Sequence, residues 1–229
     1  RSQLLIALGD ALAHEEEIVL PGGPRASRAL PIAVYLTGLP EFADMAGART
    51  GATFARRFRT TILEPISDND LLAALHPFVT EGWQVPGGER VYMEASAQRT
   101  IVELSRGEPF LFQLAGERAW YAGTDNLITA EQVASGWRGA VHEAETHVQR
   151  ILERLPARER EFLEAMAQLP PSERTLTNIA RALDYHRASD AGPTAQRLDL
   201  IRRVICRGRP HYTFRNRAVG AYLESDWPE

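Results

Sequence analysis

Hydrophobic residues recur every three to four positions over most of the chain after residue 66, and this spacing predicts helices. Two of these helices begin with a capping pattern, in which a hydroxyl residue is followed three positions later by an acid or an amide. The first predicted helix starts at Ser67, with Asp70 as its capping partner, and two more lie over 91–105 and 109–122. The fourth starts at Thr129, with Gln132 as its capping partner, and runs to about Leu155.

The pattern changes after Pro156, which ends the last of these runs. Shorter helices are predicted over 158–169 and 177–185, and Gly192-Pro193 opens a third, with Leu198, Ile201 and Ile205 expected to face inward. Two short strands follow, over 204–208 and 211–215. Three short helices and a hairpin, in this order, are typical of a winged helix-turn-helix.

The first 66 residues carry different signals. Leu4, Leu5, Leu8 and Leu12 predict a helix that stops before the acidic run 15–17, because acids are unfavourable at a helix C-terminus. Residues 18–30 and 83–90 contain the proline and glycine typical of loops. The apolar run 31–40 reads as a parallel strand buried on both faces, and residues 60–65 are a candidate short strand.

The bulk composition limits where the chain works. It has 229 residues, 44% of them hydrophobic, and no apolar run approaches the ~18 residues of a membrane helix. It shows no signal-peptide pattern, and its single cysteine, Cys206, excludes an internal disulfide. A cytoplasmic protein without membrane contact is therefore expected. Because the sequence begins with Arg1, a fragment or a processed chain is also expected.

All 26 basic residues are arginine. A codon bias toward GC-rich DNA explains this composition, but the lack of lysine still has a chemical consequence. A phosphate-binding loop of the form G-x-x-x-x-G-K-[ST] needs its lysine to reach the β- and γ-phosphates, and Schiff-base chemistry needs one too. This sequence therefore carries neither kind of site.

Several stretches, in order, resemble the back half of a P-loop ATPase of the AAA/STAND kind, similar to origin-recognition-type ATPases. No single motif is specific, and the order and spacing of the motifs carry the resemblance. The stretches are Ile32–Pro40, similar to the strand that ends at the sensor-1 position; Phe54–Phe58 with Ile62–Ile66, similar to the entry into the lid; Ser105–Leu114, similar to the G-x-P lid helix; and Tyr212–Arg217 with Ala221–Leu223, similar to the wing and closing helix.

The resemblance implies a mainly α chain with few strands and three parts. Residues 1–66 would be the end of an α/β P-loop core, 67–155 a helical lid bundle, and 156–229 a winged-helix domain. It also implies that ATP and Mg are bound by the intact protein, through a phosphate loop and an acidic strand that this sequence lacks. No cofactor is expected on this chain alone.

The same resemblance implies roles for four residues. Thr37 would sense the γ-phosphate, or it simply ends a strand. Arg57, with Arg56 and Arg59 as alternatives, would be an arginine finger acting on a neighbouring subunit of a homo-oligomer, or part of a solvated basic turn. Gly107 and Pro109 would lie near the adenine, although proline also simply favours a helix start. Four aromatic residues are expected in the core rather than stacked on a base: Phe110, Phe112, Trp120 and Tyr121.

Arginines are concentrated near the C-terminus, although the net charge of the chain is −4. If the helix from 193 is a recognition helix, these arginines would meet DNA phosphates or base edges. Alternatively, they pair with acidic residues of the lid, and the module binds a partner protein. The candidates are Arg197, Arg203, Arg209, Arg215 and Arg217.

The six histidines show no metal-ligand spacing, and no G-x-S-x-G pattern indicates a hydrolase. Two functions remain open. The chain is the lid and winged-helix part of an ATP-driven switch, or it is a binding module for DNA or a partner protein without chemistry of its own.

Overall fold

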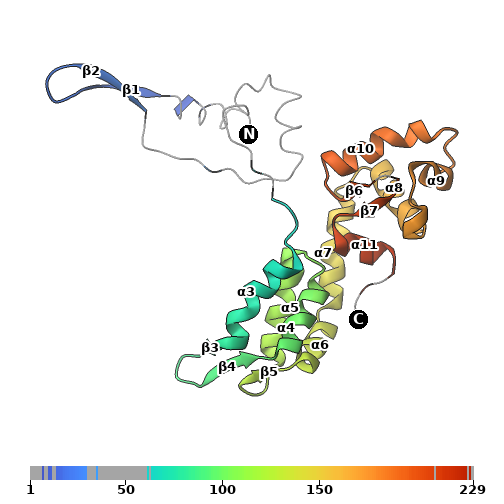
Figure 1. Ribbon diagram of the computed structural model, residues 1–229, viewed down its shortest axis with the longest axis horizontal. Coiled ribbons are helices and arrows are strands. Elements are labelled where there is room, and N and C mark those ends of the chain that lie inside the picture. The colour runs from blue at the N-terminus through green and yellow to red at the C-terminus, as the bar shows by residue number, and fades with distance from the viewer. Residues whose placement is uncertain are drawn as a thin grey trace. The chain divides into compact units, whose positions relative to one another are not determined.

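The computed structural model describes residues 7, 10, 11, 14–29, 35, 61, 63–208, 210–225 and 227. The chain divides into two compact units, Arg1–Leu63 and Glu64–Glu229. The second unit is mainly helical (Figure 1). It contains all the buried core residues of the described chain. The prediction of a mainly helical chain with a few short strands is thereby confirmed.

In the first unit the structure describes helical residues at positions 7, 10 and 11, within the predicted helix, and a β-hairpin over 15–29, where the sequence predicted an acidic run after that helix and a loop. Strand β1 (Glu15–Val19) pairs antiparallel with β2 (Arg25–Ala29). Gly22 and Gly23 have φ of 105° and 100°, which glycine alone adopts readily, and they reverse the chain direction. The predictions over 31–40 and around Thr37 lie outside the described residues, apart from Tyr35.

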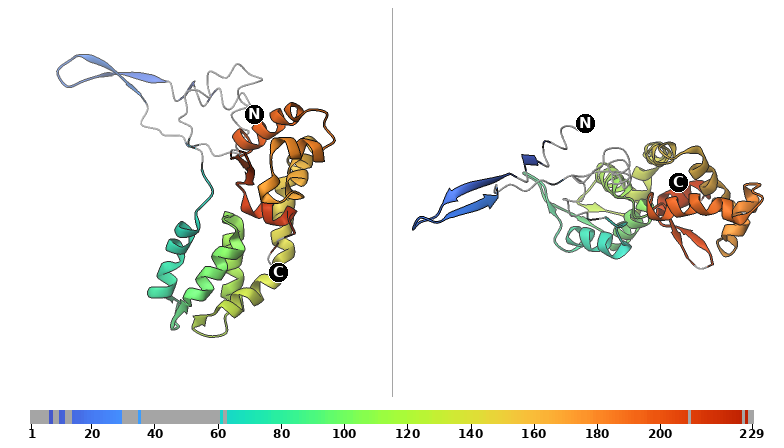
Figure 2. Two further views of the ribbon diagram at one scale, coloured as in Figure 1. Left: turned by 45° about the vertical axis from the view of Figure 1, so that its right-hand side comes forward. Right: turned by 90° about the horizontal axis from the view of Figure 1, so that it is seen from above.

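The second unit begins with a helical bundle (Figure 2). Helix α5 packs against α4 and α6, and α3 packs against α4. Buried aliphatic side chains and Trp137 fill the space between these helices. The helices are α3 (Asp68–Thr80), α4 (Ala95–Ser105), α5 (Pro109–Ala122), α6 (Ala130–Arg138) and α7 (Val141–Glu153).

A small sheet closes one end of the bundle. Strand β4 (Arg90–Met93) pairs antiparallel with β3 (Trp83–Gln84) and parallel with β5 (Leu127–Ile128). The helix predicted over 91–105 therefore begins only at Ala95. The predicted loop 83–90 contributes β3 and the first residue of β4.

The single helix predicted from Thr129 to Leu155 is two helices. Its capping box is confirmed: the Gln132 amide donates to Thr129 Oγ1 at 3.3 Å, and the Thr129 amide donates to Gln132 Oε1 at 3.0 Å. The helix ends at Arg138, and Gly139 and Ala140 separate it from α7. Glycine is among the weakest helix formers, so a break between the two helices is expected at Gly139.

After Pro156 the predicted order of elements is confirmed. Three helices are followed by a hairpin and a closing helix, and the first helix packs against the other two and against the closing helix. Phe162 of the first helix is fully buried. Leu198 is buried on the third helix as predicted, whereas Ile205 is buried on a strand. The elements are α8 (Ala157–Ala167), the 3₁₀ turns η2 (Pro171–Glu173) and η3 (Ala188–Ala191), α9 (Leu176–Ala182), α10 (Gly192–Leu200), β6 (Ile205–Arg207), β7 (Tyr212–Phe214) and α11 (Arg217–Leu223).

Two aromatic residues expected in the core lie at the surface. Trp120 is 38% exposed and Tyr121 is 75% exposed, near the end of α5. Phe110 and Phe112 are partly buried against the core, as expected. None of the described helices combines the length and the apolar composition that a membrane span requires.

Candidate functional site

The turn between α4 and α5 carries the Gly107-Glu108-Pro109 motif. Helix α4 ends at Ser105, and Arg106 and Gly107 follow with φ of 48° and 74°. Two successive left-handed residues reverse the chain, and Pro109 then starts α5 with a ring that already has helical φ. Residues 105–109 are called the lid turn below.

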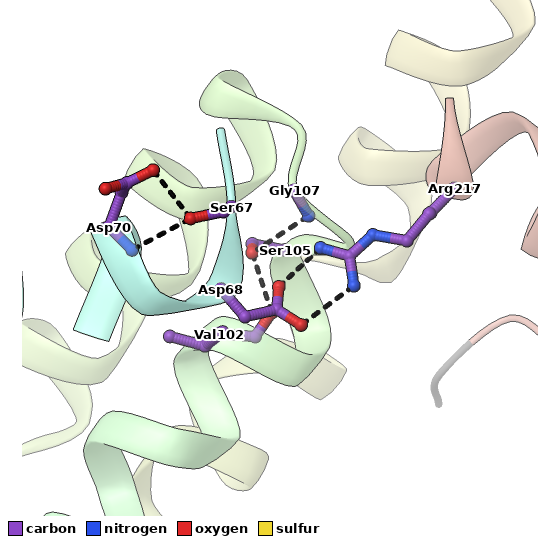
Figure 3. A network of polar contacts seen from close by, with 7 residues as sticks. All are labelled: Ser67, Asp68, Asp70, Val102, Ser105, Gly107 and Arg217. Carbon is purple, nitrogen blue, oxygen red and sulfur yellow. Dashed lines mark hydrogen bonds and ion pairs between the residues drawn. The ribbon is translucent and has the colours of Figure 1, made fainter. Parts of the chain in front are cut away.

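The hydroxyl of Ser105 fixes the shape of the lid turn from inside. This side chain is completely buried. Its Oγ donates to the Val102 carbonyl oxygen at 2.7 Å and accepts from the Gly107 amide at 3.3 Å (Figure 3). A buried hydroxyl with both a donor and an acceptor role satisfied holds the turn in one conformation.

Gly107 faces the start of α11 at very short range. A Cβ atom on this glycine would lie 2.8 Å from Nη2 of Arg217 and 3.2 Å from the carbonyl oxygen of Ile66. Only a residue without a side chain lets the guanidinium pass this close to the backbone. The lid turn, the segment before α3 and α11 therefore meet at Gly107.

The Arg217 guanidinium is held there by Asp68, the first residue of α3. Nη1 donates to Oδ2 of Asp68 at 3.0 Å, and Nη2 bonds the other carboxylate oxygen (Figure 3). The hydrogen bond from Arg217 lowers the pKa of Asp68, although partial burial acts in the opposite direction. The same hydrogen bond raises the pKa of Arg217.

Glu108 joins the lid turn to two further helices. Its Oε1 lies 3.1 Å from Nε2 of His147 on α7, and its Oε2 accepts from Nδ2 of Asn216 at 3.3 Å. The ring of Phe110 stacks on His147 with centroids 4.3 Å apart. Asn216 also caps α11, since its Oδ1 accepts from the Val219 amide at 3.0 Å.

A second set of ion pairs ties residues 64–68 to the C-terminal hairpin. This segment is called the acidic strap. Glu64 forms ion pairs with Arg203 and, at 3.7 Å, with Arg215. Nη2 of Arg215 also donates to Asp199 of α10 at 3.2 Å. Arg203 follows α10 with φ of 56°, an uncommon conformation for an arginine.

Arg197 takes part in a third set, within the C-terminal elements. Its Nε donates to Oε1 of Glu159 at 3.0 Å, and Nε of Arg202 donates to Oε2 at 2.7 Å. The Glu159 side chain is only 4% exposed. Two arginines around one buried carboxylate satisfy the charge of that carboxylate, which would otherwise be costly to bury.

The sequence-predicted site residues thus fall into three groups. Gly107 and Pro109 lie together in the lid turn, and Arg217 reaches the same turn. Arg203 and Arg215 lie at the acidic strap, and Arg197 lies at Glu159. Outside the described residues are Thr37, Arg57 and Arg209.

Four residues of the site were missed by the sequence. Glu64, Asp68, His147 and Asn216 act through contacts with residues far away in the chain, so no local spacing reveals them. The sequence offered one hint, an acidic residue in the middle of the Gly107–Pro109 motif. In the structure the two oxygens of this residue, Glu108, contact His147 and Asn216.

A depression of about 230 Å³ lies beside the lid turn. Arg106, Arg174 and Arg217 line it together with Phe214 and Glu224. Arg174 pairs with Glu224 at 2.6 Å and lies over the Phe214 ring at 5.5 Å. In the part of the chain that the structure describes, no cluster of three or more His, Cys, Asp or Glu side chains is arranged to hold a metal ion.

Comparisons of the chain with known protein families, with curated proteins and with solved structures found no match.

Proposed function

We propose that this chain is the lid and winged-helix portion of an ATP-dependent switch of the AAA/STAND kind. In this proposal α3–α7 form the lid, and α8–α11 with the β6–β7 hairpin form the winged domain. Phosphate and magnesium are bound by residues outside this sequence, since a chain without lysine has no P-loop lysine.

One observation supports the proposal best: the lid turn contacts the C-terminal elements directly. Gly107 lies against Arg217 of α11, and Glu108 reaches Asn216, the cap of the same helix. A nucleotide that contacts Gly107 or Pro109 would therefore act on the residues that position α11. This is a hinge-type coupling, in which a small shift at the turn moves a packed element.

The alternative is a binding module without chemistry of its own. The clustering of arginines on α10, the hairpin and α11 favours it, because guanidinium groups suit phosphate and carboxylate partners. Each described candidate arginine is engaged by a carboxylate of the same chain, which is also what packing within the protein requires.

Calorimetry with ATP and magnesium tests the proposal. We expect no binding by this chain and clear binding by the full-length product of the gene, called the longer product below. Tight binding by this chain alone would place the phosphate site within this sequence. It would contradict the proposal that phosphate and magnesium are bound by residues outside it. Failure of both to bind would leave the binding module as the function.

A matched pair of variants in the longer product tests the role of the lid turn. Pro109→Ala is expected to weaken ATP binding about fivefold, equivalent to about 1 kcal/mol. Pro171→Ala, a proline that also starts a helical turn but lies in η2, is the control and is expected to leave the affinity unchanged. Equal affinities for the two variants would remove Pro109 from the site.

A further inference from the structure

The carboxylates of the acidic strap form ion pairs with three arginines of the C-terminal elements. Arg203 follows α10, Arg215 follows β7 and Arg217 starts α11. Glu64 engages the first two and Asp68 engages the third. Three arginines that lie at or just after the ends of different elements thus contact one five-residue segment.

These ion pairs differ in burial from those at Glu159. Glu159 is 4% exposed, and its arginines belong to the same group of elements. In the strap, Glu64 is 60% exposed and Asp68 is 49% exposed. Exposed pairs contribute little to stability and are screened by salt. The strap is therefore the displaceable part, whereas the Glu159 pairs are permanent.

The geometry at Asp68 is one that phosphate also satisfies. Both terminal nitrogens of Arg217 bond its carboxylate, and an arginine presents the same two-pronged donor to a phosphate group. Carboxylates of the strap stand where phosphate oxygens of a ligand would lie.

The strap limits which ligands can compete. It is part of the same chain, so its effective concentration at the arginines exceeds that of any free acidic peptide. Duplex DNA can compete with the strap despite its high effective concentration. DNA offers closely spaced phosphates and releases condensed counterions on binding.

We propose that Arg203, Arg215 and Arg217 form a binding surface for the phosphate backbone of duplex DNA, and that the acidic strap blocks this surface until DNA displaces it. The inference rests on the alternative given under the proposed function, a binding module.

Fluorescence anisotropy with a labelled duplex of random sequence tests the proposal on the full chain. Glu64→Gln with Asp68→Asn removes the blocking charges and is expected to tighten binding at least tenfold. The slope of log K against log salt should also become steeper by about 2, one each for Arg203 and Arg217, because Arg215 keeps its pair with Asp199 at 3.2 Å.

The control carries the same change in net charge at other places. Glu117→Gln with Glu131→Gln neutralises two exposed carboxylates on α5 and α6 and is expected to leave DNA binding unchanged. Adding Arg203→Ala, Arg215→Ala and Arg217→Ala to the strap variant should abolish the gain. An equal gain in the control, or no gain in the strap variant, would overturn the proposal.

A measurement on the unmodified chain covers the case in which the variants fold poorly. Saturating DNA at low salt should speed amide hydrogen exchange in a peptide that spans residues 61–70, because the strap leaves its arginines. Unchanged or slower exchange would contradict displacement. Neither experiment involves nucleotide, so a failure here is distinguishable from a failure of the longer product to bind ATP.

Discussion

At the scale of single residues, Gly107 is the position where the site depends most on the absence of a side chain. Its φ of 74° is unfavourable for alanine, and a Cβ atom would lie 2.8 Å from Arg217. We expect Gly107→Ala to lower the free energy of unfolding by about 1–2 kcal/mol from backbone strain alone, with a further cost if the guanidinium cannot move. Urea unfolding followed by circular dichroism measures the change.

Gly116 provides the control for this substitution. It lies within α5, and a Cβ atom there would meet no atom within 4 Å. Gly116→Ala should stabilise the protein by about 0.5–1 kcal/mol, because alanine is the better helix former. Equal effects at both glycines would show that the lid turn imposes no special requirement.

The ion pair between Asp68 and Arg217 predicts a pH dependence. The pKa of Asp68 is lowered in the folded state, so its contribution to stability is present above the unfolded pKa of about 3.9 and disappears as pH falls through the folded value. Since both side chains are nearly half exposed, the coupling should be about 0.5–1 kcal/mol at neutral pH.

A double-mutant cycle with Asp68→Asn and Arg217→Gln isolates that coupling from the effect of Asp68 on the dipole of α3. Unfolding measured at neutral pH and again near pH 2 should show the coupling and then its loss. A coupling that persists in acid would contradict a carboxylate pair.

At the scale of elements, Glu159 joins α8 to α10 and to the residues that follow it. Replacing it by glutamine removes the buried carboxylate that Arg202, which is 12% exposed, contacts at 2.7 Å. Breaking a buried pair of this kind typically costs about 3–5 kcal/mol, and we expect the lower end because Arg197 is half exposed. Thermal unfolding of Glu159→Gln measures the loss, and Glu161→Gln, exposed on the same helix, should unfold like the parent chain.

Elements set by local chemistry were predictable from the sequence. The caps at Thr129 and Ser67 and the start at Gly192-Pro193 gave helix starts within one residue of those observed. The strands β3, β4 and β5 are two to four residues long and are held by pairing with distant segments, so no periodicity reveals them. The β1–β2 hairpin was missed because its acidic residues 15–17 were used only to mark where the preceding helix stops, and the residues after them were interpreted as a loop.

The candidate site was predictable only in part, for the same reason. Gly107 and Pro109 stand in a local motif, and the clustering of arginines is visible in the sequence. Their partners are not, because Arg217 meets Asp68 and Arg203 meets Glu64 across more than a hundred positions in the chain. The sequence showed arginines concentrated near the C-terminus, and the structure supplies the carboxylates that pair with them.

At the scale of the whole molecule, the hydrophobic core of the described residues lies in the second unit. All the buried hydrophobic residues of the described chain lie between Leu71 and Ala221. A fragment of residues 64–229 keeps this core, the acidic strap and the lid turn. It should therefore unfold cooperatively, with a Tm within about 4 °C of the full chain, which corresponds to a change of about 1 kcal/mol.

A second fragment, residues 95–229, shows what this result depends on. It lacks α3 and β4, and with them the buried side chains of Leu71, Leu75 and Met93. Each buried side chain of this size contributes about 1.5–3 kcal/mol, so the loss approaches the whole stability of an ordinary domain. Calorimetric unfolding of both fragments should therefore separate them sharply. A fragment 64–229 that unfolds without cooperativity would mean that the first unit completes the core, and that the two units fold as one.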